Sequence, residues 1–106
     1  MLPKKKRVTK EAFRVLMKEG KTLSTPFFLF YYKKSDLPQF VFVAPKNTFK
    51  NAVKRNKWRR IGYNILRSMP LKAGQGIFVY KKPVITAKSD EIKENIVFIL
   101  KKAGFL

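Results

Sequence analysis

The sequence predicts an α+β fold, with a small mixed sheet of about four strands packed by three helices. Three observations lead to this class. In three segments, apolar residues recur at every third or fourth position, which is the period of an amphipathic helix. In three others, aromatic and β-branched residues are concentrated, which is typical of strands. These segments follow one another as helix, two or three strands, helix, strand, helix, and this order favours helices packed on one sheet in a single domain spanning residues 1–106.

The first helix is expected at about Lys10 to Glu19. Thr9 can serve as its N-cap, and Glu11 lies in the first turn, where the helix dipole favours a negative charge. Gly20 follows as a residue type that commonly ends helices. Ahead of the helix, Pro3–Arg7 forms a short basic arm that either frays in solvent or tracks phosphates. The apolar residues at helical spacing are Ala12, Phe13, Leu16 and Met17.

The next two strong segments predict strands. Thr25–Lys33 is dense in aromatic residues and is apolar on both faces, so one face should meet the core and the other must be covered or bind something flat. Gln39–Ala44 is the second strand, and the short turn at 35–38 predicts an antiparallel hairpin between the two. Lys21–Ser24 is a candidate for a further short strand.

The central helix is expected from about Phe49 to Ser68, after Pro45 ends the preceding strand. Gly62 lies inside it and costs about 1 kcal/mol of helix propensity relative to alanine. It marks either a weak point or a close approach of another element. The apolar stripe expected from the spacing is Trp58, Ile61, Ile65 and Met69. The polar stripe expected on the opposite side is Asn56, Arg60, Tyr63 and Arg67.

The C-terminal third predicts one strand and one helix. Ile77–Tyr80 is the strand, preceded by a loop at 72–76. Ser89 is expected to cap the last helix, with Asp90 and Glu91 in its first turn. Gly104 should end it. The core stripe of this helix is Ile92, Ile96, Ile99, Leu100 and Ala103.

The charge of the chain indicates the class of its partner. Lys and Arg number 25 against 6 Asp and Glu, which gives a net charge of +19. Such a charge opposes compaction and favours an anionic partner, either nucleic acid or a membrane surface. No apolar run approaches the roughly 20 residues that span a bilayer, and the N-terminus lacks the pattern of a signal peptide. We therefore expect a cytoplasmic protein that binds nucleic acid and no membrane.

The positive charge is concentrated in the middle of the chain. No acidic residue lies between Asp36 and Asp90, and the segment from Lys46 to Arg60 is especially rich in Lys and Arg. The alternative is an ordinary solvated helix, but surface helices normally carry both signs of charge. Lysine and arginine neutralise phosphates, and aromatic faces stack on unpaired bases. The combination favours single-stranded or structured RNA over duplex DNA.

The residues needed for protein-based catalysis are scarce. The chain contains no histidine and no cysteine, so the usual general base near neutral pH and thiolate metal ligands are both absent. Three of its carboxylates, on Asp90, Glu91 and Glu94, gather at the start of the last helix, where helix capping explains them. A nuclease that acts without an RNA component is therefore disfavoured, and any chemistry should be carried by a partner.

The central segment resembles the bacterial ribonuclease P protein component. The match is carried by the run Ala52-Val53-Lys54-Arg55-Asn56-Lys57-Trp58-Arg59-Arg60, with Arg67 further along. Weaker matches lie at 12–15 with Gly20-Lys21, at 28–32 and at 100–104, and together they cover nearly the whole chain. The resemblance implies the order α-β-β-β-α-β-α. It also implies a non-catalytic subunit of the endoribonuclease that removes the 5′ leader of precursor tRNA, with Mg²⁺-dependent hydrolysis performed by the RNA subunit.

The resemblance also implies two sets of binding residues. Those expected to contact the catalytic RNA are Lys46, Lys50, Lys54, Arg55, Asn56, Lys57, Arg59, Arg60 and Arg67. Those expected to line a groove for the single-stranded leader are Phe13, Met17 and Tyr31. Core packing is the alternative role for Phe13. The implied partners are the catalytic RNA and precursor tRNA, with no protein partner and no metal site assigned to the protein. The competing function is a structural RNA-binding protein, such as a ribosomal component, and composition does not separate the two.

Overall fold

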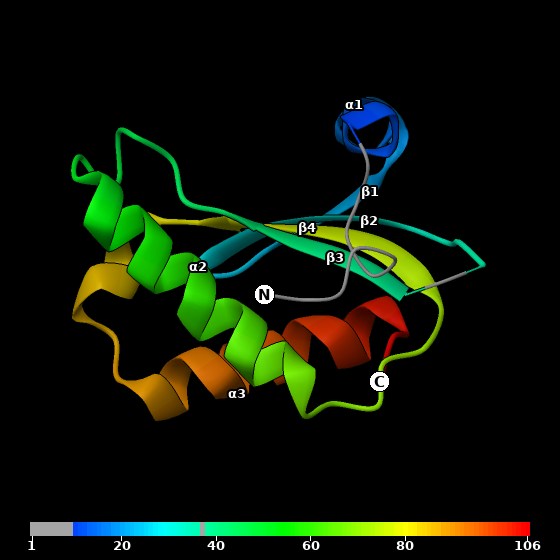
Figure 1. Cartoon of the computed structure of the whole chain (residues 1–106). Coiled ribbons are helices and arrows are strands. Elements are labelled where there is room, and N and C mark those ends of the chain that lie inside the picture. The colour runs from blue at the N-terminus through cyan, green and yellow to red at the C-terminus, as the bar shows by residue number, and fades with distance from the viewer. Residues whose placement is uncertain (1–9, 37) are drawn as a thin grey trace.

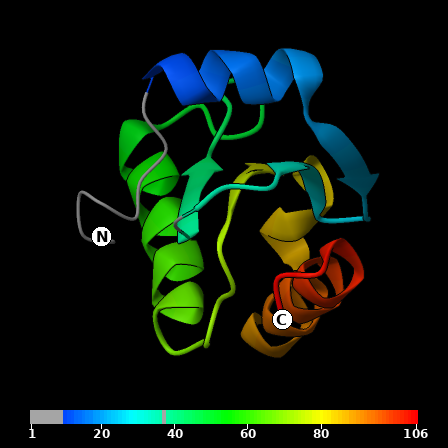
Figure 2. The same cartoon turned by 90° about the vertical axis from the view of Figure 1, so that its right-hand side faces the viewer.

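The computed structural model describes residues 10–36 and 38–106, with residues 10–12 described by their backbone only (Figure 1). Four strands form one mixed sheet in the spatial order β1-β2-β4-β3. α1 crosses one face of the sheet, and α2 and α3 lie on the other (Figures 1 and 2). The α+β class and the order α-β-β-β-α-β-α are confirmed. The elements are α1 (Lys10–Glu19), β1 (Lys21–Ser24), β2 (Phe28–Lys33), β3 (Pro38–Val43), α2 (Ala52–Arg67), β4 (Gly74–Tyr80), the 3₁₀ helix η2 (Lys82–Thr86) and α3 (Ser89–Ala103).

The predicted hairpin between β2 and β3 is wrong, because β4 lies between them. β2 pairs with β4 in antiparallel fashion and β3 pairs with β4 in parallel, so Phe30 and Phe42 are both partners of Phe78. Parallel neighbours need a long crossover connection, which α2 supplies. β4 is central because it is apolar on both faces: the adjacent residues Ile77 and Phe78 are each 0% exposed. This burial outweighs the proximity of β2 and β3 along the chain.

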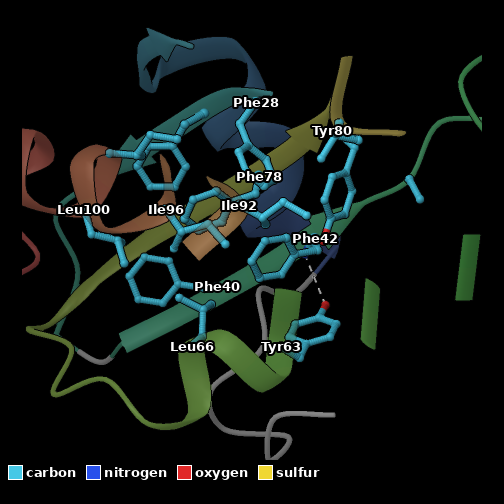
Figure 3. Close-up of a cluster of buried hydrophobic side chains, with 14 of the residues drawn as sticks. Phe28, Phe40, Phe42, Tyr63, Leu66, Phe78, Tyr80, Ile92, Ile96 and Leu100 are labelled. Atoms are coloured by element: carbon cyan, nitrogen blue, oxygen red, sulfur yellow. Dashed lines mark hydrogen bonds between the residues drawn. The ribbon is translucent and has the colours of Figure 1, made fainter. Parts of the chain in front are cut away.

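The core lies between the sheet and the helices α2 and α3 (Figure 3). Alternate residues of β2, β3 and β4 point to this side, and five of them are buried phenylalanines: Phe28, Phe30, Phe40, Phe42 and Phe78. The rings of Phe42 and Phe78 are stacked with centroids 4.6 Å apart, and Phe28 meets Phe78 edge to face at 5.5 Å. Such aromatic pairs add about 0.5–1.5 kcal/mol each beyond the area they bury. From α3, four of the five predicted core residues are buried, namely Ile92, Ile96, Ile99 and Leu100, and the fifth, Ala103, is half-buried at the margin of the core.

The buried face of α2 differs from the predicted apolar stripe. Tyr63 was expected on the polar side, but it is only 4% exposed. Its hydroxyl oxygen accepts a hydrogen bond from the backbone N–H of Phe42, at 3.2 Å (Figure 3). Gly62 is the close-approach point: a Cβ there would lie 2.6 Å from the Phe42 ring. The helix therefore turns Gly62, Tyr63 and Leu66 inward and leaves Trp58, Ile65 and Met69 at the margin of the core.

The helix ends agree with the predictions in part. α1 has the predicted bounds, but Thr9 and the basic arm at 3–7 lie outside the described residues. α2 begins three residues later than Phe49, because Asn51 is the N-cap and accepts a 2.7 Å hydrogen bond from the backbone N–H of Val53. The N-cap of α3 is Lys88 rather than Ser89, with the carboxylate of Glu91 accepting from the Lys88 backbone N–H at 3.1 Å.

Two further features of the strands and turns match expectation. The short strand at Lys21–Ser24 is present and pairs with β2. Gly104 ends α3 in the left-handed conformation, with φ of 89°, which glycine adopts without strain. Pro38, in contrast, was expected in the turn and instead begins β3 at the edge of the sheet, where the missing N–H of proline is tolerated.

Candidate RNA interface

The solvent face of α2 carries a row of cations. Its exposed basic residues follow one another at spacings of three or seven, so they lie on one side of a 16-residue helix about 24 Å long. α2 contains no Asp or Glu. Within the described residues, none of these side chains forms an ion pair. We call this row the α2 ridge, and its members are Lys54, Lys57, Arg60 and Arg67.

Two of the predicted arginines are partly used by the fold. Arg55 is half-buried, and its Nη1 donates a 2.8 Å hydrogen bond to the backbone carbonyl oxygen of Phe49. Arg59 is half-buried as well, and its Nη2 donates to the side-chain oxygen of Asn56. Each guanidinium has five N–H donors, so several remain available. Both side chains are therefore held in place beside the ridge, whereas the members of the ridge itself are free to meet a ligand.

A hollow at the N-terminal end of α2 extends the ridge. Its volume is about 490 Å³, and it has an aromatic wall formed by Trp58, which stacks on Phe49 with centroids 5.7 Å apart. Lys50 and Lys82 line it together with Lys54 and Lys57 of the ridge, and none of the acidic side chains that the structure describes lines it. Lys82 comes from η2, far along the chain, and was not among the predicted contact residues. The basic turn Lys81-Lys82-Pro83 is the signal that could have indicated it.

The rigidity of this region comes from the core beneath it. Tyr80 is the last residue of β4, and its hydroxyl donates a 2.5 Å hydrogen bond to the backbone carbonyl oxygen of Trp58. Burial raises the pKa of this hydroxyl well above its ordinary value, so the group stays protonated as a donor. The ring of Tyr80 also contacts those of Phe49 and Trp58 edge to face. The aromatic wall of the hollow is thus fixed to the sheet.

The predicted leader-binding residues lie on the other face of the sheet. Phe13 is half-buried and Met17, one turn later in α1, is 42% exposed. Both line a shallow hollow beside α1 that Tyr31 does not line. Tyr31 is half-buried in β2, opposite in direction to the core residues Phe28 and Phe30, so it belongs to the α1 side. The structure therefore brings Phe13 and Met17 together and leaves Tyr31 on the strand beneath the helix.

Phe13 is not among the buried core residues, so its alternative role in core packing is weakened. From residue 13 to the end of α1, Leu16 is instead the residue that is fully buried, at 0% exposed.

The remaining predicted contacts, Lys46 and Lys50, lie before α2 and are exposed. In the described ranges no helix has the length and apolar character to cross a bilayer. In the same ranges, no three His, Cys, Asp or Glu side chains are grouped to hold a metal ion.

A comparison with protein families decides the relationship. The model of the Ribonuclease P family matches residues 2–104. The chain belongs to the Ribonuclease P family. It is 26% identical over 96 residues to the Ribonuclease P protein component of Exiguobacterium sp., an alignment that covers 88% of this chain and 84% of that protein.

Solved Ribonuclease P proteins share the fold. A Staphylococcus aureus RNase P protein mutant with defective mRNA degradation activity matches with a TM-score of 0.84 at 21% identity, over 95% of this chain and 90% of that one. The RNase P protein from Thermotoga maritima matches with a TM-score of 0.80 at 22% identity, over 91% and 96%. The resemblance seen in the sequence is confirmed. Family membership carries with it a role in maturing the 5′ ends of tRNA, as part of a ribonucleoprotein with an RNA partner.

Proposed function

We propose that this chain is the non-catalytic protein subunit of ribonuclease P. In this proposal it binds the catalytic RNA through the α2 ridge, holds the 5′ leader of precursor tRNA on the α1 side, and so assists endonucleolytic removal of the leader. The observation that carries the proposal is the ridge itself, with cations at Lys54, Lys57, Arg60 and Arg67 and no paired carboxylate in the described part of the chain. The cytoplasmic location expected from the sequence belongs to the same proposal.

The ridge suits phosphate better than it suits a protein partner. Unpaired cations spaced along one helix repel each other, and a polyanion relieves that repulsion. Each phosphate that is neutralised releases condensed counterions, so binding should weaken steeply as salt rises. Arg55 and Arg59 add guanidinium groups that are already oriented by hydrogen bonds, which reduces the entropy lost on binding.

The assignment of chemistry to the RNA rests on the residues that the protein offers. The chain has no histidine or cysteine. Glu91 at the start of α3 accepts a capping hydrogen bond, as the sequence suggested for this acidic group. In our proposal Mg²⁺ is held by the RNA subunit and supplies the hydrolytic chemistry there, while the protein binds, orients and neutralises charge.

Reconstitution with the catalytic RNA tests the proposal. The protein should lower the Mg²⁺ concentration that gives half-maximal leader removal, because its cations replace part of the counterion requirement. Leader removal is measured on precursor tRNA across a Mg²⁺ series with and without the protein. An unchanged Mg²⁺ requirement would contradict the proposal. Recovery of the tagged protein with ribosomes, and not with one abundant small RNA, would favour the structural alternative instead.

Substitutions on the α1 side test the leader contact. Phe13→Ala and Tyr31→Ala should weaken binding of precursor tRNA more than binding of mature tRNA, because a stacked base contributes about 1–3 kcal/mol and only the precursor carries the leader. Phe98→Ala is a matched control, since Phe98 is an aromatic residue of α3 that is 53% exposed and lines neither the hollow beside α1 nor the hollow at the start of α2. Affinities for both tRNAs are measured on the reconstituted complex. Equal losses for precursor and mature tRNA would remove the leader contact from the proposal.

A further inference from the structure

A second cationic hollow lies at the opposite edge of the molecule from the α2 ridge. It is formed where the end of α1, the end of β2 and the end of α3 meet, and its volume is about 490 Å³. This lies in the range of roughly 300–1,000 Å³ that is typical of sites for small ligands. We call it the β1-edge pocket. The side chains that give it its chemistry are Lys21, Lys33, Lys34, Lys102, Tyr32 and Phe105.

The charge of this pocket is strongly unbalanced. All four of its lysines are exposed, and Glu19 is the acidic residue that lines it. Within residues 10–36 and 38–106, Glu19 forms no ion pair with any of these lysines. The ammonium group of Lys102 lies 5.6 Å from the centre of the Phe98 ring, a contact that leaves its charge unneutralised. The pocket therefore favours an anion.

Its aromatic floor is rigid. The ring of Tyr32 is stacked on Phe30 with centroids 5.5 Å apart, and Phe105 meets it edge to face at 5.9 Å. Phe105 is 4% exposed and is accommodated by Gly74, where a Cβ would lie 2.2 Å from the Phe105 ring. Its backbone N–H donates to the carbonyl oxygen of Leu100 at 2.8 Å. Tyr32 is half-buried, with its ring held by Phe30 and Phe105, so the part of the ring that remains accessible offers a fixed surface on which a base can stack.

The pocket and the ridge are too far apart for one nucleotide to contact both. β1 and β3 are the two edges of the sheet, and α2 packs beside β3. Three strand spacings separate these edges, about 14 Å. Figure 2 shows the end of α3 and β1 on the side of the molecule away from α2. A nucleotide in the pocket is therefore distinct from any nucleotide that lies on the ridge.

We propose that the β1-edge pocket binds one nucleotide of a single-stranded RNA segment, with the four lysines at its flanking phosphates and Tyr32 stacked on its base. The chain would then hold RNA at two separate places. The inference rests on the proposed function only in taking RNA as the partner. The residues of the β1-edge pocket belong neither to the α2 ridge nor to the proposed leader-binding residues. Failure of the pocket to bind RNA would therefore leave both of those contacts in place.

The test uses a five-nucleotide single-stranded RNA that contains 4-thiouridine, added to the whole chain. Two readouts separate the sites. Photocrosslinking to the peptide that contains Tyr32 reports on the β1-edge pocket. Quenching of Trp58, the single tryptophan of the chain, reports on the hollow at the start of α2. The variant is Lys33→Ala/Lys34→Ala, and the control is Lys93→Glu, which lowers the net charge by the same two units at an exposed site outside both hollows.

The double variant should reduce the yield of the crosslink at Tyr32 at least about fivefold. The plot of log crosslink yield against log salt should become shallower by about 1.4, which corresponds to two phosphate contacts on a single strand. Quenching of Trp58 fluorescence by the same RNA should stay within about twofold of the value for the parent protein. A crosslink reduced no more than by Lys93→Glu would overturn the proposal, as would competition by inorganic phosphate as effective as that by unlabelled RNA. In the parent protein, a crosslink at Tyr32 without quenching of Trp58 would support the pocket and would show that this short RNA does not enter the hollow at the start of α2.

Discussion

The two faces of α2 carry opposite kinds of residue: buried residues on the inner face pack against the sheet, and exposed cations on the outer face are available to a ligand. The inner face holds Gly62, Tyr63 and Leu66 against the sheet, and it has no charged member among its buried residues. The outer face presents the unpaired cations of the α2 ridge. The comparison teaches that a helix this basic stays folded because packing through its inner face compensates the repulsion along its outer face. Stability and RNA binding should therefore respond to different substitutions in the same helix.

The largest effect on stability is expected at the inner face. Leu66→Ala should lower the free energy of unfolding by about 2–5 kcal/mol, because Leu66 is 1% exposed and its loss leaves a cavity under α2. Denaturant unfolding measures this loss, and the RNA affinity of the protein that remains folded should keep its salt dependence. A loss below about 1 kcal/mol would show that the inner face does not hold the helix.

A smaller loss is expected at Tyr63. Tyr63→Phe keeps the ring that contacts Phe42 edge to face at 5.3 Å but removes the oxygen that accepts from the Phe42 backbone N–H. A buried donor without a partner costs about 1–3 kcal/mol. Chemical denaturation should give this loss, and hydrogen exchange at the Phe42 amide should become faster. Unchanged exchange at that amide would argue against the hydrogen bond as the reason for the burial of Tyr63.

The smallest effect on stability, with a clear effect on binding, is expected at the outer face. Arg60→Ala should change the free energy of unfolding by no more than about 0.5 kcal/mol, because Arg60 is exposed and unpaired. The variant should bind the catalytic RNA more weakly than the parent does. The slope of log affinity against log salt should fall by the amount expected for about one phosphate contact. Lys93→Ala on α3 is the control, and it should leave binding as in the parent. A parental salt dependence for Arg60→Ala would remove Arg60 from the phosphate contacts.

The same comparison explains what the sequence could predict. The bounds of α1, the core stripe of α3 and the positive charge of α2 follow from residue spacing, and all were expected. The position of β4 was not, because strand order depends on which strand can be buried on both faces, a property of the assembled sheet. Tyr63 was assigned to the polar side because its hydroxyl counts as polar, although a single backbone donor was enough to satisfy it in the core.

The candidate site was predictable to a similar extent. The cations of one helix can be found from the sequence, since they share a period. The sequence shows that Lys82 belongs to a basic turn, but it does not show that this turn lies beside the start of α2, where Tyr80 packs on Trp58. Arg55 and Arg59 were expected as contacts equal to the rest, and only the structure shows them hydrogen-bonded beside the ridge.

The salt dependence of binding to the catalytic RNA tests the central claim most directly. The measurement compares the parent with the variant Lys54→Gln/Lys57→Gln/Arg60→Gln/Arg67→Gln, which removes the α2 ridge and leaves the inner face of α2 intact. If these cations meet phosphates, the plot of log affinity against log salt should become shallower by about 3.6, at roughly 0.9 per contact. A slope equal to that of the parent, from a variant that remains folded, would contradict the account.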